Sequence, residues 1–129
     1  MSYSNPFLQA HYQWHLHDFG AGAAAHEVKG PLGRRGRLKF ISCNTSETFN
    51  AVTTPGYVRV GTAGDNDAYA ELNFATAAAD ITFDSDRDDT NAIIDGDIPA
   101  DTDVVVNFVS PTGGTPAGIA TVNIFIDWF

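Results

Sequence analysis

The sequence predicts an all-β domain, an antiparallel β-sandwich of the jelly-roll type with about eight strands. Apolar residues recur with a period of two in most segments, and no segment carries a clear helical period over the length of a usual helix. Clusters of Gly, Pro and Asp separate these segments at short intervals, as in small antiparallel folds. The 129 residues suit one domain with one hydrophobic core.

The first half of the chain contains four of the expected strands. The first begins near Tyr12, where Tyr12, Trp14 and Leu16 alternate with polar residues, so we expect these apolar side chains to face the core. A loop rich in Gly follows at 30–36. The other three strands are expected at 37–42, 49–52 and 57–60, with a type II turn at Pro55-Gly56 between the last two.

The second half adds a segment that fits two structures, followed by two clear strands. The apolar residues of 68–79 fit either a helix capped by Asp67 or an alternating strand, and we prefer the strand. Residues 103–109 are rich in β-branched side chains and form the clearest buried strand. Residues 119–129 alternate without a break, which predicts a last strand tied into a sheet or an interface. Brief apolar pairs also occur at 81–83 and 93–94.

We expect one sandwich domain over residues 11–129, preceded by an extended N-terminal arm over residues 1–10. The first residues lack the basic and apolar regions of a secretory signal, and no apolar run approaches the roughly 20 residues of a membrane-spanning helix. The single cysteine, Cys43, allows no internal disulfide. These features predict synthesis in a cytoplasm and no membrane partner.

Charge is divided unevenly along the chain. Residues 1–59 carry six of the seven Lys and Arg against three acids, a net charge of +3, whereas residues 60–129 carry one arginine against thirteen acids, a net charge of −12. The sum of −9 argues against nucleic acid as a partner, because phosphate binding depends on cationic contacts. Opposite potentials on one molecule steer docking, so the pattern favours assembly with copies of the chain or with another protein surface.

Two groups of residues have spacings that metal ligands use, although we assign a metal to neither. His15 and His17 are two apart on the expected first strand, so both could bind one divalent ion, or they could line the hydrated face of an edge strand. Asp84, Asp86 and Asp88 have the spacing that opens a calcium loop, but Asp89 occupies the position that needs glycine. Without calcium, this acidic loop would be solvated or would face a basic partner surface.

No group of residues predicts catalysis. Cys43 has no glycine elbow or histidine signature around it, and the glycine-containing loops at 61–64 and 111–114 lack a P-loop lysine. Because catalysis needs convergent titratable groups, we expect neither an enzyme nor a cofactor.

Two segments carry a resemblance to a known class of proteins. The run Gly56–Tyr69, GYVRVGTAGDNDAY, and the closing run Gly118–Phe129 resemble small virion proteins of tailed bacteriophages, in particular the head-decoration (cement) class. The likeness covers residues 38–129, and the acidic insert 84–97 departs from it. The resemblance implies a β-rich protein on the outer capsid surface, often a trimer, whose partner is the major capsid protein. It assigns no functional residue.

The expected function is therefore structural: the protein would decorate and stabilise a phage capsid by bridging neighbouring capsid subunits, as a homotrimer. We expect basic residues of one copy to meet an acidic loop of the next copy or acids of the shell, while the N-terminal arm reaches a neighbour. Phe125 and Phe129 would meet a neighbour or pack under the chain's own loops. Two alternatives stay open, a calcium-dependent carbohydrate-binding jelly roll and a tail, neck or fibre component. The charged residues expected at the contact are Arg34, Arg35, Arg37, Asp86, Asp88 and Asp89.

Overall fold

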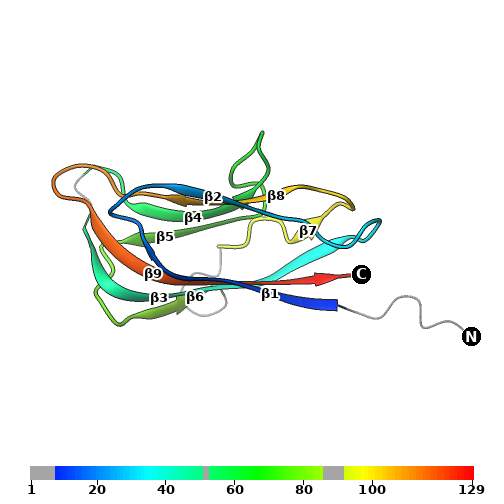
Figure 1. Cartoon of the computed structure of the whole chain (residues 1–129), viewed down its shortest axis with the longest axis horizontal. Helices are drawn as coiled ribbons and strands as arrows, with labels where there is room; N and C mark the ends of the chain where they lie inside the picture. The colour runs from blue at the N-terminus through cyan, green and yellow to red at the C-terminus, as the bar shows by residue number, and fades with distance from the viewer. Residues whose placement is uncertain (1–7, 51–52, 86–91) are drawn as a thin grey trace, which may run out of the picture.

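The computed structural model describes residues 8–50, 53–85 and 92–129 and folds them into two packed antiparallel sheets (Figure 1). Sheet A has the strand order β1-β9-β3-β6, with β7 also paired to β3, and sheet B has the order β2-β8-β4-β5. No helix in this part of the chain is long and apolar enough to cross a membrane. The strands are β1 (Leu8–Asp18), β2 (Ala24–Val28), β3 (Gly36–Asn50), β4 (Gly56–Gly61), β5 (Ala70–Ala75), β6 (Thr82–Asp84), β7 (Asp97–Ile98), β8 (Val104–Val109) and β9 (Ala117–Trp128).

The strand pairing is that of a jelly roll. β1 pairs with β9, β2 with β8, β3 with β6 and β4 with β5, so the first half of the chain pairs in nested order with the second half. Rolling up this long hairpin joins β9 to β3 and β8 to β4, which produces the two sheets. The predicted sandwich is confirmed, and β7, of two residues, is a short addition to eight main strands.

The hydrophobic core fills the space between the sheets and follows from the alternation of side chains. In β9 every second residue from Ala120 to Trp128 is buried, as the period of two predicted. Sheet B contributes the buried face of β8, which is the strand predicted at 103–109. At one end of the core, the rings of Phe49 and Phe74 stack with centroids 4.2 Å apart, and Phe19 packs against both.

Three segments show where the predicted elements were right and where they were incomplete. The segment after Asp67 contains a strand, β5, as we preferred, because Ala70, Leu72 and Phe74 face the core. Ile93 forms only an isolated bridge with Ala70. β2 was not predicted, because only its last residue is a large aliphatic side chain.

β3 is a single strand of 15 residues where two shorter strands were expected. Its pairing with β9 changes register between Leu38 and Phe40 and at two further places up to Asn50. Register shifts of this kind bend a strand and increase its twist. β3 and β9 accordingly curve together at the end of the sandwich away from the C-terminus (Figure 1).

A bulge in β1 reverses the orientation predicted for the end of that strand. The register with β9 shifts between Trp14 and His17, and Leu16 adopts a left-handed backbone with φ of 50°. Trp14 packs against the core as predicted, but Leu16 is 48% exposed, and His17 turns inward with its ring 4.7 Å from that of Phe19. The prediction for Leu16 is wrong because one extra residue shifts the alternation of side chains by one position.

Candidate functional site

Two charged segments of the chain lie beside each other at one end of the sandwich. They are residues 29–39, which contain the β2–β3 loop, and residues 95–103, which contain the β7–β8 loop. Because β2 pairs with β8 and β3 pairs with β7, both loops leave the sheets near the C-terminus (Figure 1). The nested topology thus joins the basic part of the sequence to an acidic part.

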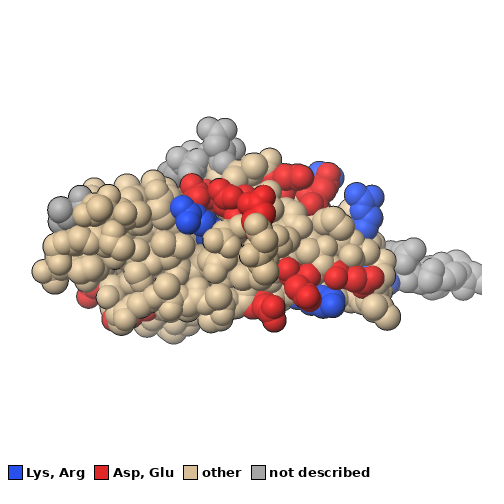
Figure 2. All heavy atoms as spheres, turned by 90° about the horizontal axis from the view of Figure 1, so that it is seen from above, with Lys and Arg blue, Asp and Glu red and all other residues tan. Residues whose placement is uncertain are grey.

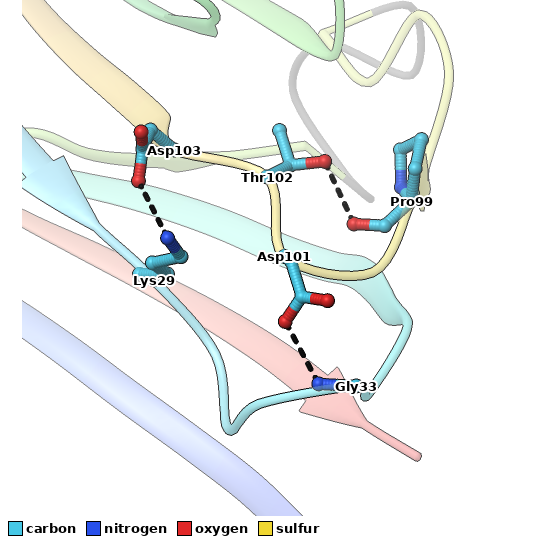
Figure 3. Close-up of polar contacts among 6 residues, drawn as sticks. All are labelled: Lys29, Gly33, Pro99, Asp101, Thr102 and Asp103. Atoms are coloured by element: carbon cyan, nitrogen blue, oxygen red, sulfur yellow. Dashed lines mark hydrogen bonds and ion pairs between the residues drawn. The ribbon is translucent and has the colours of Figure 1, made fainter.

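Ion pairs within the chain neutralise part of this basic segment. The Nζ atom of Lys29 lies 3.3 Å from Oδ1 of Asp103 (Figure 3), and an Nη atom of Arg37 lies 2.6 Å from Oδ1 of Asp97. All four side chains are more than half exposed, so each pair contributes about 1 kcal/mol or less. Arg37, expected to pair with an acid of an adjacent subunit or of the shell, is therefore paired with an acid of its own chain. On the face that Figure 2 presents, Lys and Arg are interspersed among Asp and Glu. The left end of the molecule in this view carries hardly any charge.

The β2–β3 loop presents a leucine at a turn of defined geometry. The backbone N–H of Arg34 donates to the carbonyl oxygen of Pro31 over 3.1 Å, and Gly33 has φ of 76°, the arrangement of a type II turn. Oδ1 of Asp101 accepts the N–H of Gly33 over 2.8 Å (Figure 3). Leu32 lies at the corner of this turn and is 90% exposed.

The two stems of the β2–β3 loop are fixed by the last two residues of the chain. The indole of Trp128 packs so closely on Gly30 and Gly36 that a Cβ at either position would come within 2.6 Å of a ring carbon. The Nε1–H of Trp128 donates to the hydroxyl of Tyr12 over 3.2 Å. Arg35 and Phe129 exchange two backbone hydrogen bonds of 2.9 and 2.8 Å. The loop is therefore held in place from its stems to its tip.

This loop is the surface that sequence reasoning identified only in part. Arg34 and Arg35 were chosen for their charge, and Arg35 is exposed beside the half-buried Arg34. Leu32 was missed. The sequence does carry a signal for it, because a turn at Pro31-Leu32-Gly33 directs the leucine side chain outward. The loop can supply an apolar contact and cationic hydrogen-bond donors, which suit protein binding.

The two phenylalanines expected at an interface lie in different surroundings. Phe125, on the outer face of sheet A, stacks on His11 with ring centroids 4.4 Å apart and lies 5.9 Å from the ring of Phe40. The chain's own residues thus cover Phe125 in part. Phe129 is 43% exposed and lies at the charged end, where its backbone is bonded to Arg35.

The histidines do not form the pair that a metal site on β1 requires. The bulge puts His15 on the outer side, where its Nδ1 lies 3.4 Å from the hydroxyl oxygen of Thr121, while His17 faces inward. The prediction that the two side chains point the same way is therefore wrong. Within residues 8–50, 53–85 and 92–129, no group of three His, Cys, Asp or Glu side chains has the geometry to hold a metal ion.

Two titratable groups have pKa values changed by their surroundings. Burial lowers the pKa of His26 below its usual value, and the positive charge of nearby His17 lowers it further. The rings of Trp14 and Phe108 lie 5.2 and 5.0 Å from that of His26. Burial raises the pKa of the Cys43 thiol, which lies in the core and is therefore a packing residue.

Some predicted residues lie outside the part of the chain that the structure describes. Asp86, Asp88 and Asp89 belong to residues 86–91, and most of the predicted N-terminal arm belongs to residues 1–7. Of the candidate calcium ligands, only Asp84 is described, at the end of β6. Calcium binding by this loop, and its contact with a basic partner, stay predictions.

Comparisons with other proteins show similarity at the level of the fold. No protein-family model matches the chain, and no curated protein does. A chain of the cyanophage Pam1 capsid asymmetric unit is similar over 98% of this chain and 88% of that chain, with a TM-score of 0.52 and 14% sequence identity. A chain from the acidic stable capsid structure of Helicobacter pylori bacteriophage KHP30 aligns over 93% of this chain and 93% of that chain, with a TM-score of 0.38 and 12% sequence identity. The Pam1 match shows that the fold is shared.

Proposed function

We propose that the protein is a structural component of a tailed-bacteriophage virion, where it decorates the outer capsid surface as a homotrimer. In this role it stabilises the shell by bridging neighbouring subunits of the major capsid protein. The observation that carries the proposal is the fold shared with a chain of the Pam1 capsid over nearly the whole length of both chains. Those coverages make the Pam1 chain only slightly longer than this one, so the similarity extends to a small protein of the same size.

The charged end of the sandwich supports a binding role. Its β2–β3 loop places Leu32 and two arginines on a turn that hydrogen bonds and the Trp128 indole hold in one geometry. A preformed loop loses little conformational entropy when it binds, so more of the contact energy appears as affinity. A protein that bridges subunits needs such preformed contacts on its surface.

The location of the protein on purified particles tests the proposal. We expect cryo-electron microscopy of virions to show its density on the outer capsid surface, in contact with two or more major capsid subunits. Shells prepared without the protein should bind it saturably and should melt at a higher temperature once it is added. An unrelated jelly-roll protein of similar size and net charge is the control. Density at the neck or tail, or shells whose melting temperature is unchanged by saturating protein, would contradict capsid decoration.

A further inference from the structure

Leu32 differs from an ordinary exposed leucine in how firmly its backbone is held. Single apolar side chains are common on protein surfaces and need no partner. Here the carboxylate of Asp101, the turn hydrogen bond of Arg34 and the two bonds between Arg35 and Phe129 all fix the backbone around the leucine. A rigid apolar side chain of this kind is suited to anchoring an interface.

A shallow groove of about 350 Å³ lies elsewhere on the same molecule, on the outer side of sheet B. Ala23 and Ala25 at the start of β2 and Val109 at the end of β8 line it with apolar side chains, and Asn66 of the β4–β5 connection also borders it. Phe108 lines it too, although its ring is buried in the core. Leucine is an apolar side chain of a size that such a surface can cover. The groove therefore offers the apolar contact that Leu32 lacks within its own chain.

The charges around the two surfaces are complementary. Asp65 and Asp67 flank Asn66, and Glu27 follows Ala25 on the same side of β2, so acids border the groove. Arg34 and Arg35 follow Leu32 in the loop, separated from it only by Gly33. Opposite charges placed in this way steer two surfaces together and set their orientation.

Arg59 lies near the groove, and its charge is already engaged. Arg59 is paired across the outer face of sheet B with Asn107, a residue that lines the groove. Its Nε donates to Glu71 over 2.7 Å, and its guanidinium lies 4.5 Å from the centre of the Tyr57 ring. The acids at the border of the groove thus keep their negative potential toward an incoming arginine.

We propose that the β2–β3 loop of one copy binds this groove on the next copy, with Leu32 in the groove and Arg34 and Arg35 against its acidic border. The β2–β3 loop leaves the end of β2, whereas residues at the start of β2 line the groove, so the two surfaces lie at different places on the molecule. The contact is therefore head-to-tail, and repetition closes a ring if the rotation between copies permits. This inference deepens the proposed function, since it names the surfaces through which copies on the shell would join.

Molar mass in solution tests the contact on the isolated full chain. We expect the wild-type protein to associate with rising concentration into multiples of its 13.8 kDa mass. Leu32→Asp removes the anchor, and Ala25→Lys blocks the groove with a charge that repels the arginines. Each change should weaken association roughly 30-fold, as expected for the loss of one central anchor. Ile94→Asp and Ala78→Lys make the same changes at exposed positions outside both surfaces and should leave association unchanged.

Mixing the two variants provides the decisive measurement. Leu32→Asp keeps an intact groove, and Ala25→Lys keeps an intact loop, so one pair of chains can still form one head-to-tail contact. At a concentration where each variant alone is monomeric, we expect a one-to-one mixture to form dimers and no larger species. Thermal melting of both variants should match that of the wild type, because both side chains are exposed.

The inference is overturned by any of three results: a wild-type protein that stays monomeric up to its solubility limit, Leu32→Asp chains that associate like the wild type, or a mixture that forms no dimer. Loss of association in the Ile94→Asp control would overturn it as well. Because no particle is present, these outcomes are separate from capsid decoration. A monomer that still binds shells removes the head-to-tail contact alone, and an oligomer that binds no shell removes the decoration role alone.

Discussion

Gly30→Ala tests whether the Trp128 indole holds the β2–β3 loop in place. A Cβ at residue 30 would lie 2.3, 2.5 and 2.6 Å from three carbons of the indole, well inside van der Waals contact. The ring cannot retreat, because Gly36 packs against it and its Nε1–H is bonded to Tyr12. Overpacking of this kind costs about 1–3 kcal/mol. Alanine recovers about 0.4–1 kcal/mol by restricting the unfolded chain, so we expect a net loss of about 1–2 kcal/mol in the free energy of unfolding.

Urea denaturation of a glycine series separates this effect from others. Gly64→Ala meets no atom within 4 Å and should be neutral or slightly stabilising, whereas Gly33→Ala also meets no atom but is strained by its φ of 76°, at about 1 kcal/mol. Trp128→Phe gives the added Cβ more room, so the double variant Gly30→Ala/Trp128→Phe should lose less stability than the sum of the single changes. If Gly30→Ala is as stable as Gly64→Ala, or if the effects of the double variant are strictly additive, the Trp128 indole does not hold the two loop stems by close packing.

Three further outcomes follow from individual contacts. Asp101→Ala removes the acceptor of the Gly33 N–H and leaves alanine in a left-handed backbone (φ 59°), so it should cost about 1–2 kcal/mol in thermal melting. Asp101→Asn keeps a side-chain oxygen that can accept the Gly33 N–H, and asparagine tolerates a left-handed backbone, so this variant should lose little stability. Equal losses of stability in the two variants would contradict this account. The pKa of His26 is lower in the folded protein than in the unfolded chain, so the unfolded chain binds more protons at acidic pH. The free energy of unfolding should therefore fall as the pH drops below about 6.5. The stability difference between wild type and His26→Phe should therefore change between about pH 7.5 and pH 5, with a constant difference as the contrary result. Cys43 should react with thiol reagents only at the rate of unfolding, and rapid labelling of the native protein would contradict its burial.

The strands of this fold were predictable wherever one face of a strand is buried and the register is regular. β9 shows this best, since every second residue from Ala120 to Trp128 is buried and the alternation breaks only at Asp127, which is buried as well. β1 shows the limit, because its alternation holds to Trp14 and then fails at Leu16. The bulge depends on pairing with β9 and on a hydrogen bond from the Leu16 N–H to Thr121. Neither is visible in the sequence of β1, and leucine is not a residue that favours a left-handed backbone.

The candidate site was predictable in composition but not in arrangement. The basic residues near 34–37 could be chosen from the sequence alone as a candidate binding segment. The partner of each cation was not, because Lys29 meets Asp103 only through the pairing of β2 with β8. The outward position of Leu32 likewise depends on Asp101, which belongs to the other half of the chain.

The division of charge along the sequence acquires a different meaning from this topology. In a jelly roll the first half of the chain pairs in nested order with the second half, so opposite charges on the two halves meet inside one molecule. Lys29 with Asp103, Arg37 with Asp97 and Arg59 with Glu71 are three such contacts. Charge division in the sequence is therefore weak evidence for docking between copies, because the fold itself uses much of it. The argument for a contact between copies rests instead on geometry at the surface: a rigid turn that exposes an apolar side chain, and a groove bordered by acids.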